Sequence, residues 1–175
     1  MSSCTFTSCS NLRPESRVVY RIRPFRREDA EALAQLAVRA IRTIGPRAYS
    51  PEQVAAWSAR HGQAASYVKR SDEGHLILVC VDDTDSPCAY ALLEGDGHLD
   101  HLYCDPDHTR QGVAENLLAE AETAARASGA TRLYTEASEL ACAAFERAGY
   151  RVSQRRDFEV DGVPIHNYAM EKALA

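Results

Sequence analysis

A six-residue loop with a central glycine is the segment of this sequence best suited to bind a diphosphate. It spans residues 109–114, follows a strand-like run and an Asp-Pro pair, and opens a strongly periodic helix. The first backbone N–H groups of a helix have no intrahelical acceptor and lie at the positive end of the helix dipole. An ordinary strand-to-helix turn with a packing glycine fits the same pattern. The loop residues are Thr109, Arg110, Gln111, Gly112, Val113 and Ala114.

The cysteines do not predict a metal centre or a disulfide framework. Of six cysteines, Cys4 and Cys9 are close in sequence but lack the companion Cys or His pair that a zinc site needs. The other four lie in apolar strand-like or helix-like runs, which is typical of buried thiols in a reducing compartment. We therefore expect a cytoplasmic protein without a metal. The four are Cys80, Cys88, Cys104 and Cys142.

Composition favours one globular domain. The 175 residues are 45% hydrophobic and 26% charged, and no apolar run reaches the length of a membrane span. The net charge of −5 and a pI near 5.7 disfavour nucleic acid as a partner. We expect a flexible polar tail over residues 1–17 and a single domain over residues 18–175.

The remaining elements follow from periodicity and turn residues. Ser50, Pro51 and Gln53 form a helix start with a capping box, and Asp161-Gly162 predicts a hairpin turn. Three strand-like runs in the middle of the chain predict an antiparallel meander. Strands are expected at 18–25, 75–81, 88–93, 98–104, 132–136, 150–160 and 163–170. Helices are expected at 30–44, 51–61, from 113 to a stop at Gly129, and at 139–148, with one more short helix around Tyr67 and Val68.

Residues 102–118 resemble the acetyl-CoA loop of the GNAT superfamily of N-acetyltransferases, whose pattern is Gln/Arg-x-x-Gly-x-Gly/Ala after a strand and a proline. Thr109 stands in the first position of the pattern, which leaves the backbone N–H groups in place. Residues 141–150 (ACAAFERAGY) are similar to a second block of the family, and residues 20–24 to its first strand. Residues 155–172 look like an uncharacterised bacterial branch of it.

The resemblance implies an α/β fold with a mixed, mainly antiparallel central sheet of about seven strands flanked by about four helices. It also implies that backbone groups of Leu102, Tyr103 and Cys104 hold the acetyl carbonyl and pantetheine arm, with residues 110–114 around the pyrophosphate. The expected reaction transfers acetyl from acetyl-CoA to an amine of a small molecule, peptide or protein, directly in a ternary complex. The alternative is a sensor that binds acyl-CoA without turnover.

Asp100 is the candidate general base, because some family members carry a catalytic carboxylate at this place on the fourth strand. The alternative is a structural carboxylate that caps or pairs. Strand alternation puts Asp100 on the face of Leu102 and Cys104 and His101 on the other, so only one of the two is expected to face the cleft. Glu136, at the end of the fifth strand, is a second candidate for orienting substrate or water.

The sequence departs from the family at the general acid, since Phe145 stands where many relatives place a tyrosine that protonates the thiolate. Either Tyr168, Tyr134, Ser138 or water replaces it, or the thiolate leaves unprotonated. Tyr49, Trp57 and His166 are candidate acceptor contacts. The exposed face of the two early helices, with Tyr49 and Trp57, is also a candidate homodimer or partner surface.

Overall fold

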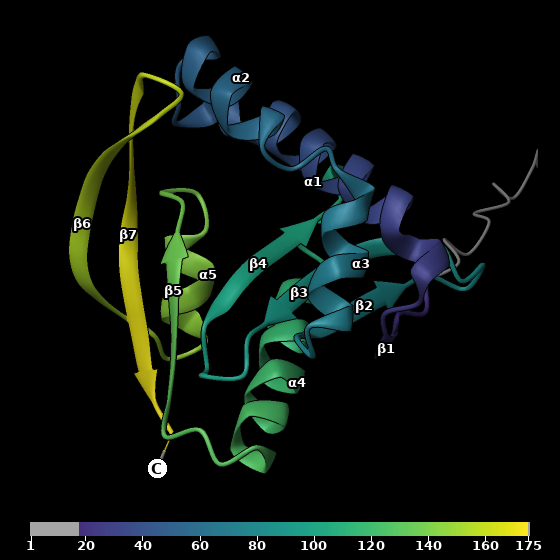
Figure 1. Ribbon diagram of the computed structural model, residues 1–175. Coiled ribbons are helices and arrows are strands. Elements are labelled where there is room, and N and C mark those ends of the chain that lie inside the picture. The colour runs from purple at the N-terminus through teal and green to yellow at the C-terminus, as the bar shows by residue number, and fades with distance from the viewer. Residues whose placement is uncertain (1–17, 175) are drawn as a thin grey trace, which may run out of the picture.

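The computed structural model describes residues 18–174 and contains the expected elements in the expected order (Figure 1). The expected tail and its two cysteines lie outside the described residues. The strands are β1 (Arg21–Pro24), β2 (Leu76–Val81), β3 (Pro87–Leu93), β4 (Leu99–Cys104), β5 (Arg132–Ala137), β6 (Arg151–Val160) and β7 (Val163–Ala173). The α-helices are α1 (Ala30–Ile44), α2 (Pro51–Ala59), α3 (Ala64–Asp72), α4 (Val113–Ala127) and α5 (Cys142–Arg147).

Local signals set most element boundaries. The Ser50 hydroxyl accepts a hydrogen bond from the Gln53 N–H, and the Gln53 side chain accepts one from the Ser50 N–H, which is the predicted capping box of α2. Asp161 and Gly162 both have positive φ and join β6 to β7 in the predicted tight turn. Helix α5 is shorter than expected and begins only at Cys142.

The seven strands are divided between two sheets, where the sequence predicted one central sheet. The first has the order β1-β2-β3-β4 and the second β5-β7-β6, and all pairings within them are antiparallel. A parallel bridge between His98 and Tyr134 joins the sheets at one end of β4 and β5. Beyond it the two strands diverge, as Figure 1 shows.

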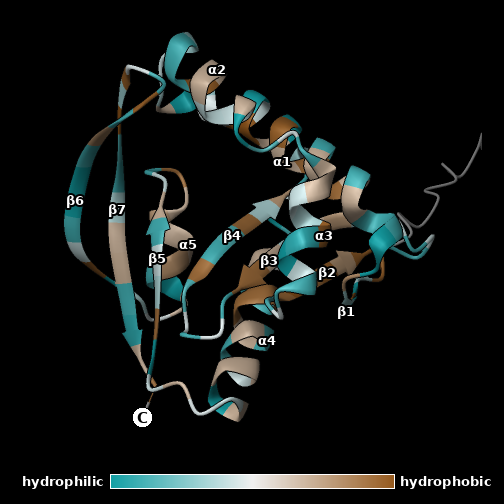
Figure 2. Cartoon of the chain, in the orientation of Figure 1, coloured by the Kyte–Doolittle hydropathy of each residue, from teal (hydrophilic) through white to brown (hydrophobic). Residues whose placement is uncertain are grey.

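Helices cover both faces of the first sheet. Helices α1 and α3 pack on one face through a core that includes Leu33, Tyr67 and Tyr90. Helix α4 packs on the other face through a core that continues to Phe145 and Met170 of the second half. Figure 2 shows hydrophobic residues in β2 and β3 and hydrophilic ones along the exposed strand β6.

A third, smaller core connects the early helices to the terminal hairpin. It contains Ile41, Tyr49, Val54, Val160 and Ile165. The Gln53 side chain also donates a hydrogen bond of 2.7 Å to the Pro164 carbonyl. Helix α2 is thereby attached to the β6–β7 hairpin across the opening between the sheets (Figure 1).

The junction of the sheets requires Gly97. Its φ is +92°, and a Cβ there would lie 2.3 Å from the Arg132 carbonyl oxygen. Gly97→Ala should therefore lower the free energy of unfolding by about 2–4 kcal/mol, from the backbone strain and the steric overlap together. Denaturant titration checks this. Gly95→Ala is the matched control, because no atom lies within 4 Å of its added Cβ; equal losses in both variants would contradict the assignment.

Candidate active site

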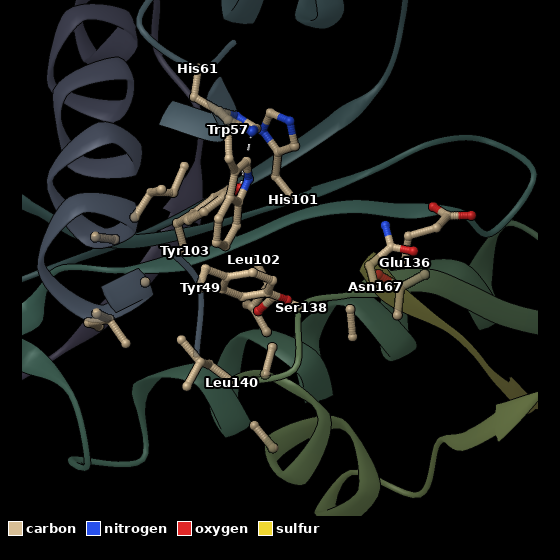
Figure 3. Close-up of a pocket in the computed structure, with 18 of the residues that line it drawn as sticks. Tyr49, Trp57, His61, His101, Leu102, Tyr103, Glu136, Ser138, Leu140 and Asn167 are labelled. Carbon is tan, nitrogen blue, oxygen red and sulfur yellow. Dashed lines mark hydrogen bonds between the residues drawn. The ribbon is translucent and has the colours of Figure 1, made fainter. Parts of the chain in front are cut away.

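A cavity of about 430 Å³ occupies the opening between β4 and β5 (Figure 3). Its volume is within the range of small-molecule sites. Ten of the residues proposed from the sequence line it together with Ser138, and Arg110, Gln111, Gly112, Val113 and Tyr168 do not. The ten are Tyr49, Trp57, Asp100, Leu102, Tyr103, Cys104, Thr109, Ala114, Glu136 and His166.

Ion pairs hold the loop that leads from β4 to α4. The Arg39 guanidinium of α1 contacts the carboxylates of Asp105 and Asp107, each at 2.5 Å. The Tyr20 hydroxyl donates a hydrogen bond of 2.7 Å to the Gln111 side chain. Side chains distant in sequence therefore fix this loop from two sides.

The backbone of the loop presents hydrogen-bond donors. Arg110 and Gly112 have φ of +62° and +78°, and α4 begins directly after Gly112. The N–H groups from Gln111 to Ala114 have no acceptor among the described residues. No atom lies within 4 Å of a Cβ built on Gly112, so the glycine serves the backbone conformation and access to the loop rather than packing.

Asp100 and His101 both line the cavity, and the expectation that only one of them faces it was wrong. The register of β4 against β3 shifts at this point: Leu92 pairs with His101 and Leu93 with Leu99. Asp100 is thus the additional residue of a β-bulge, which interrupts strict alternation of side chains. Sequence periodicity carries no signal for a single inserted residue.

The Asp100 carboxylate is held on one side only. Its Oδ2 accepts a hydrogen bond of 2.7 Å from Arg70 of α3 and lies 3.6 Å from His101 Nε2. Arg70 also pairs with Glu94. Asp100 Oδ1 has no hydrogen-bond partner among the described residues, so one carboxylate oxygen can accept a hydrogen bond from a ligand.

Two neutral imidazoles lie beside this carboxylate. Burial lowers the pKa of His61 to about 4, with the nearby His101 adding to the shift, and burial also lowers the pKa of His101. The His61 ring lies 5.0 Å from the His101 ring, and its Nε2 is 3.2 Å from the Tyr103 hydroxyl (Figure 3). The sequence did not point to His61, because a single histidine after α2 has no distinguishing pattern.

Glu136 is bound by His98 and Arg156 at the edge of the cavity. Its Oε2 lies 2.7 Å from His98 Nε2, and its Oε1 lies 3.1 Å from Arg156. His98 also contacts Glu94 at 3.0 Å. Burial opposes the charged imidazole, but the hydrogen bonds with Glu94 and Glu136 outweigh it and raise the pKa of His98.

Phe145 is buried against Tyr150 and lines the cavity without a group that can donate a proton. Of the three side chains considered as replacements, Ser138 lines the cavity. Tyr168 does not, and Tyr134 is stacked on His98 with its hydroxyl bound to Asp96.

The proposed acceptor contacts form one group between α2 and β7. Tyr49 packs at 5.5 Å from both Trp57 and His166, measured between ring centroids. Its hydroxyl donates to the His166 carbonyl and accepts from the Glu139 N–H. Tyr49 is therefore a fixed wall of the cavity. Phe158 and Asn167 also line the cavity, although the sequence did not single them out.

Residues 46–172 match the family model described as an acetyltransferase (GNAT) domain, which is more than half of the chain. The chain belongs to the GNAT acetyltransferase family. The protein is accordingly an enzyme of the N-acetyltransferase class, as the resemblance of its loop predicted. Among residues 18–174 no group of three or more His, Cys, Asp or Glu side chains is arranged so that it could hold a metal ion, and no helix there is long and apolar enough to cross a membrane.

Similar proteins cover nearly the whole chain. The uncharacterised N-acetyltransferase YafP of Escherichia coli is 26% identical over 150 residues, which is 86% of this chain and 93% of YafP. A GCN5-related N-acetyltransferase of Rhodopseudomonas palustris superposes with a TM-score of 0.82 at 32% identity, over 88% of this chain and 95% of that one. The PaiA N-acetyltransferase of Thermoplasma acidophilum, solved with coenzyme A, has a TM-score of 0.73 at 19% identity, over 89% and 99%.

The contacts of His98 with Glu94 and Glu136 should stabilise the folded protein by an amount that depends on pH. Because the folded-state pKa of His98 is raised, its stabilisation is fully present below about pH 6.5 and is lost as pH rises through the folded-state value. His98→Gln should therefore reduce the free energy of unfolding more at pH 6 than at pH 8.5. Urea titrations of both proteins at each pH measure the difference, and a pH-independent difference would contradict this account.

Proposed function

We propose that this protein transfers the acetyl group of acetyl-CoA to an amine of a small molecule, peptide or protein by direct transfer in a ternary complex. The observation that supports it best is one cavity whose lining runs from the loop before α4 to the group of Asp100, His101 and Glu136. The coenzyme A bound to the Thermoplasma relative supports the choice of donor. Acetyl-CoA, when bound, supplies a thioester carbonyl that an amine can attack.

The pyrophosphate is proposed to bind at the loop of residues 109–114. The N–H groups from Gln111 to Ala114 have no acceptor among the described residues, and the space next to Gly112 is open. Both properties fit an anion at a helix N-terminus. The backbone of Leu102, Tyr103 and Cys104, on the edge of β4 that faces β5, is proposed to hold the pantetheine arm and acetyl carbonyl.

Asp100 is proposed to accept the proton that the amine must lose. Its free Oδ1 can hydrogen-bond an ammonium, while Arg70 stabilises the charged carboxylate from the Oδ2 side. The carbon–sulfur bond then breaks as the carbon–nitrogen bond forms, and the sulfur leaves as a thiolate. Ser138 is proposed to donate a hydrogen bond to that thiolate in place of the absent tyrosine.

Gly112→Ala should weaken acetyl-CoA binding at least about tenfold, because the added methyl group projects into the open space and a positive φ is strained for alanine. Isothermal titration calorimetry measures the affinity. Gly129→Ala is the matched control: Gly129 has φ of +83° and open surroundings but follows the other end of α4. Equal affinities in the two variants would place the pyrophosphate elsewhere.

Acetyl-CoA turnover against a panel of amino acids, polyamines, aminoglycosides and peptides tests the reaction itself. Asp100→Asn should lower kcat by about 10² to 10⁴ and leave the acetyl-CoA dissociation constant within about twofold. Asp157→Asn, on the exposed strand β6, is the control that should keep full activity. An unchanged pH–rate profile in Asp100→Asn would refute the base, and cofactor binding without turnover of any amine would favour the sensor.

A further inference from the structure

The carboxamide of Asn167 is the feature of the cavity that the reaction described above leaves unexplained. Asn167 lies on β7 and lines the cavity. Its Oδ1 is buried without a hydrogen-bond partner, and its Nδ2 makes no hydrogen bond among the described residues either. Leaving a buried polar group unsatisfied costs about 1–3 kcal/mol. A bound ligand that hydrogen-bonds to this carboxamide would remove that free-energy cost, which would explain why the group is present.

Two other buried side-chain atoms in residues 18–174 have no hydrogen-bond partner, but neither belongs to a residue that lines the cavity. Arg70 Nε belongs to a guanidinium that already binds Asp100 and Glu94. The Tyr150 hydroxyl belongs to a ring packed on Phe145, and Tyr150 does not line the cavity. Asn167 alone of the three combines an unsatisfied atom with a place in the cavity wall and no other polar contact of its side chain.

The neighbours of Asn167 make no hydrogen bond to its side chain among the described residues. It faces Arg156 across the β6–β7 pairing, and Arg156 is bound to Glu136 at 3.1 Å. Glu136 pairs with Ala169 across β5 and β7, which places Asn167 diagonally next to it on the same face. Both oxygens of Glu136 are used, by Arg156 and His98. Figure 3 shows the Asn167 amide and Glu136 together at one side of the cavity.

This setting selects the chemistry of a ligand group. We propose, on the basis of the acetyltransferase function above, that Asn167 binds an amide group of the acceptor, so that the substrates are amines that carry a peptide-type amide. An amide supplies one N–H and one C=O and can satisfy both atoms of the carboxamide. A second ammonium would satisfy Oδ1 alone. A carboxylate would satisfy Nδ2 alone.

The rest of the wall suits an alkyl stem between the amide and the reacting amine. Tyr49, Trp57, Phe158 and Ile165 line the same cavity and present aromatic or aliphatic surface. Asp100, the proposed proton acceptor, lines it from β4. In an acceptor with an amide, an apolar stem and a terminal amine, the amide would therefore lie at Asn167, the stem along the apolar residues and the amine at Asp100.

A series of ω-amino N-methylamides with one to five methylene groups tests the inference, each compared with the n-alkylamine of the same stem length. In the wild-type enzyme the best amide should exceed its alkylamine by about tenfold in kcat/KM. Asn167→Leu should reduce that ratio to less than about threefold and leave the KM for acetyl-CoA unchanged. Calorimetric binding of the same pairs to the CoA-saturated protein gives a readout that needs no turnover.

Stability separates this role from a structural one. Asn167→Leu replaces an unsatisfied polar group with an apolar one of similar size, so its Tm should equal or exceed the wild-type value. Gln154→Leu, on the exposed face of β6, is the control and should keep the wild-type amide preference. Asn167→Ser serves if the leucine variant does not fold.

The outcomes are distinct. Equal use or binding of amides and alkylamines by the wild-type protein would overturn the inference, and so would an amide preference that survives in Asn167→Leu. In both cases turnover of any amine would leave the proposed function intact. Binding of amides without turnover would overturn the proposed function and retain Asn167 as an amide-binding residue.

Discussion

The divergence of β4 from β5 is the constraint on which this molecule depends. The two strands are in contact at Gly97, His98 and Tyr134, and the Thr135 hydroxyl still satisfies the Leu99 carbonyl. Beyond that point each strand is the edge of its own sheet. Backbone groups along such edges need partners. The fold thus creates an opening between the sheets with backbone polar groups along its two strand edges, and helices on the first sheet together with the terminal hairpin enclose it.

Around this opening, some carboxylate oxygens are held in ion pairs and others have no partner among the described residues. Arg70 holds one oxygen of Asp100, and Arg156 and His98 occupy both oxygens of Glu136. These pairs connect elements from both sheets and from α3. Burial keeps the imidazoles of His61 and His101 neutral, so hydrogen bonding rather than net charge dominates their part of the cavity. The carboxylate positions are consequently rigid, while a few atoms remain open to a ligand.

The places proposed to bind a ligand are also places where the local conformation or hydrogen bonding is unfavourable. Arg110 adopts a left-handed backbone conformation, the first N–H groups of α4 have no acceptor among the described residues, and Asn167 keeps an unsatisfied oxygen. Local costs of this kind persist where the surrounding structure determines them, and they concentrate at functional sites. Arg39 and Tyr20 supply that surrounding structure for the loop, and the β6–β7 hairpin supplies it for Asn167.

The sequence by itself determined the element order, the capping box of α2, the hairpin turn at Asp161-Gly162 and the glycine loop before α4, because periodicity, capping and turn chemistry act between residues close in the chain. Only the tertiary structure decided that the strands form two sheets and that a bulge at Asp100 turns it and His101 to one cavity. It also decided that His61 and Asn167 line that cavity and that Arg70 binds Asp100. Those contacts join residues that are tens of positions apart, and their strength comes from burial and hydrogen bonding that no local pattern records.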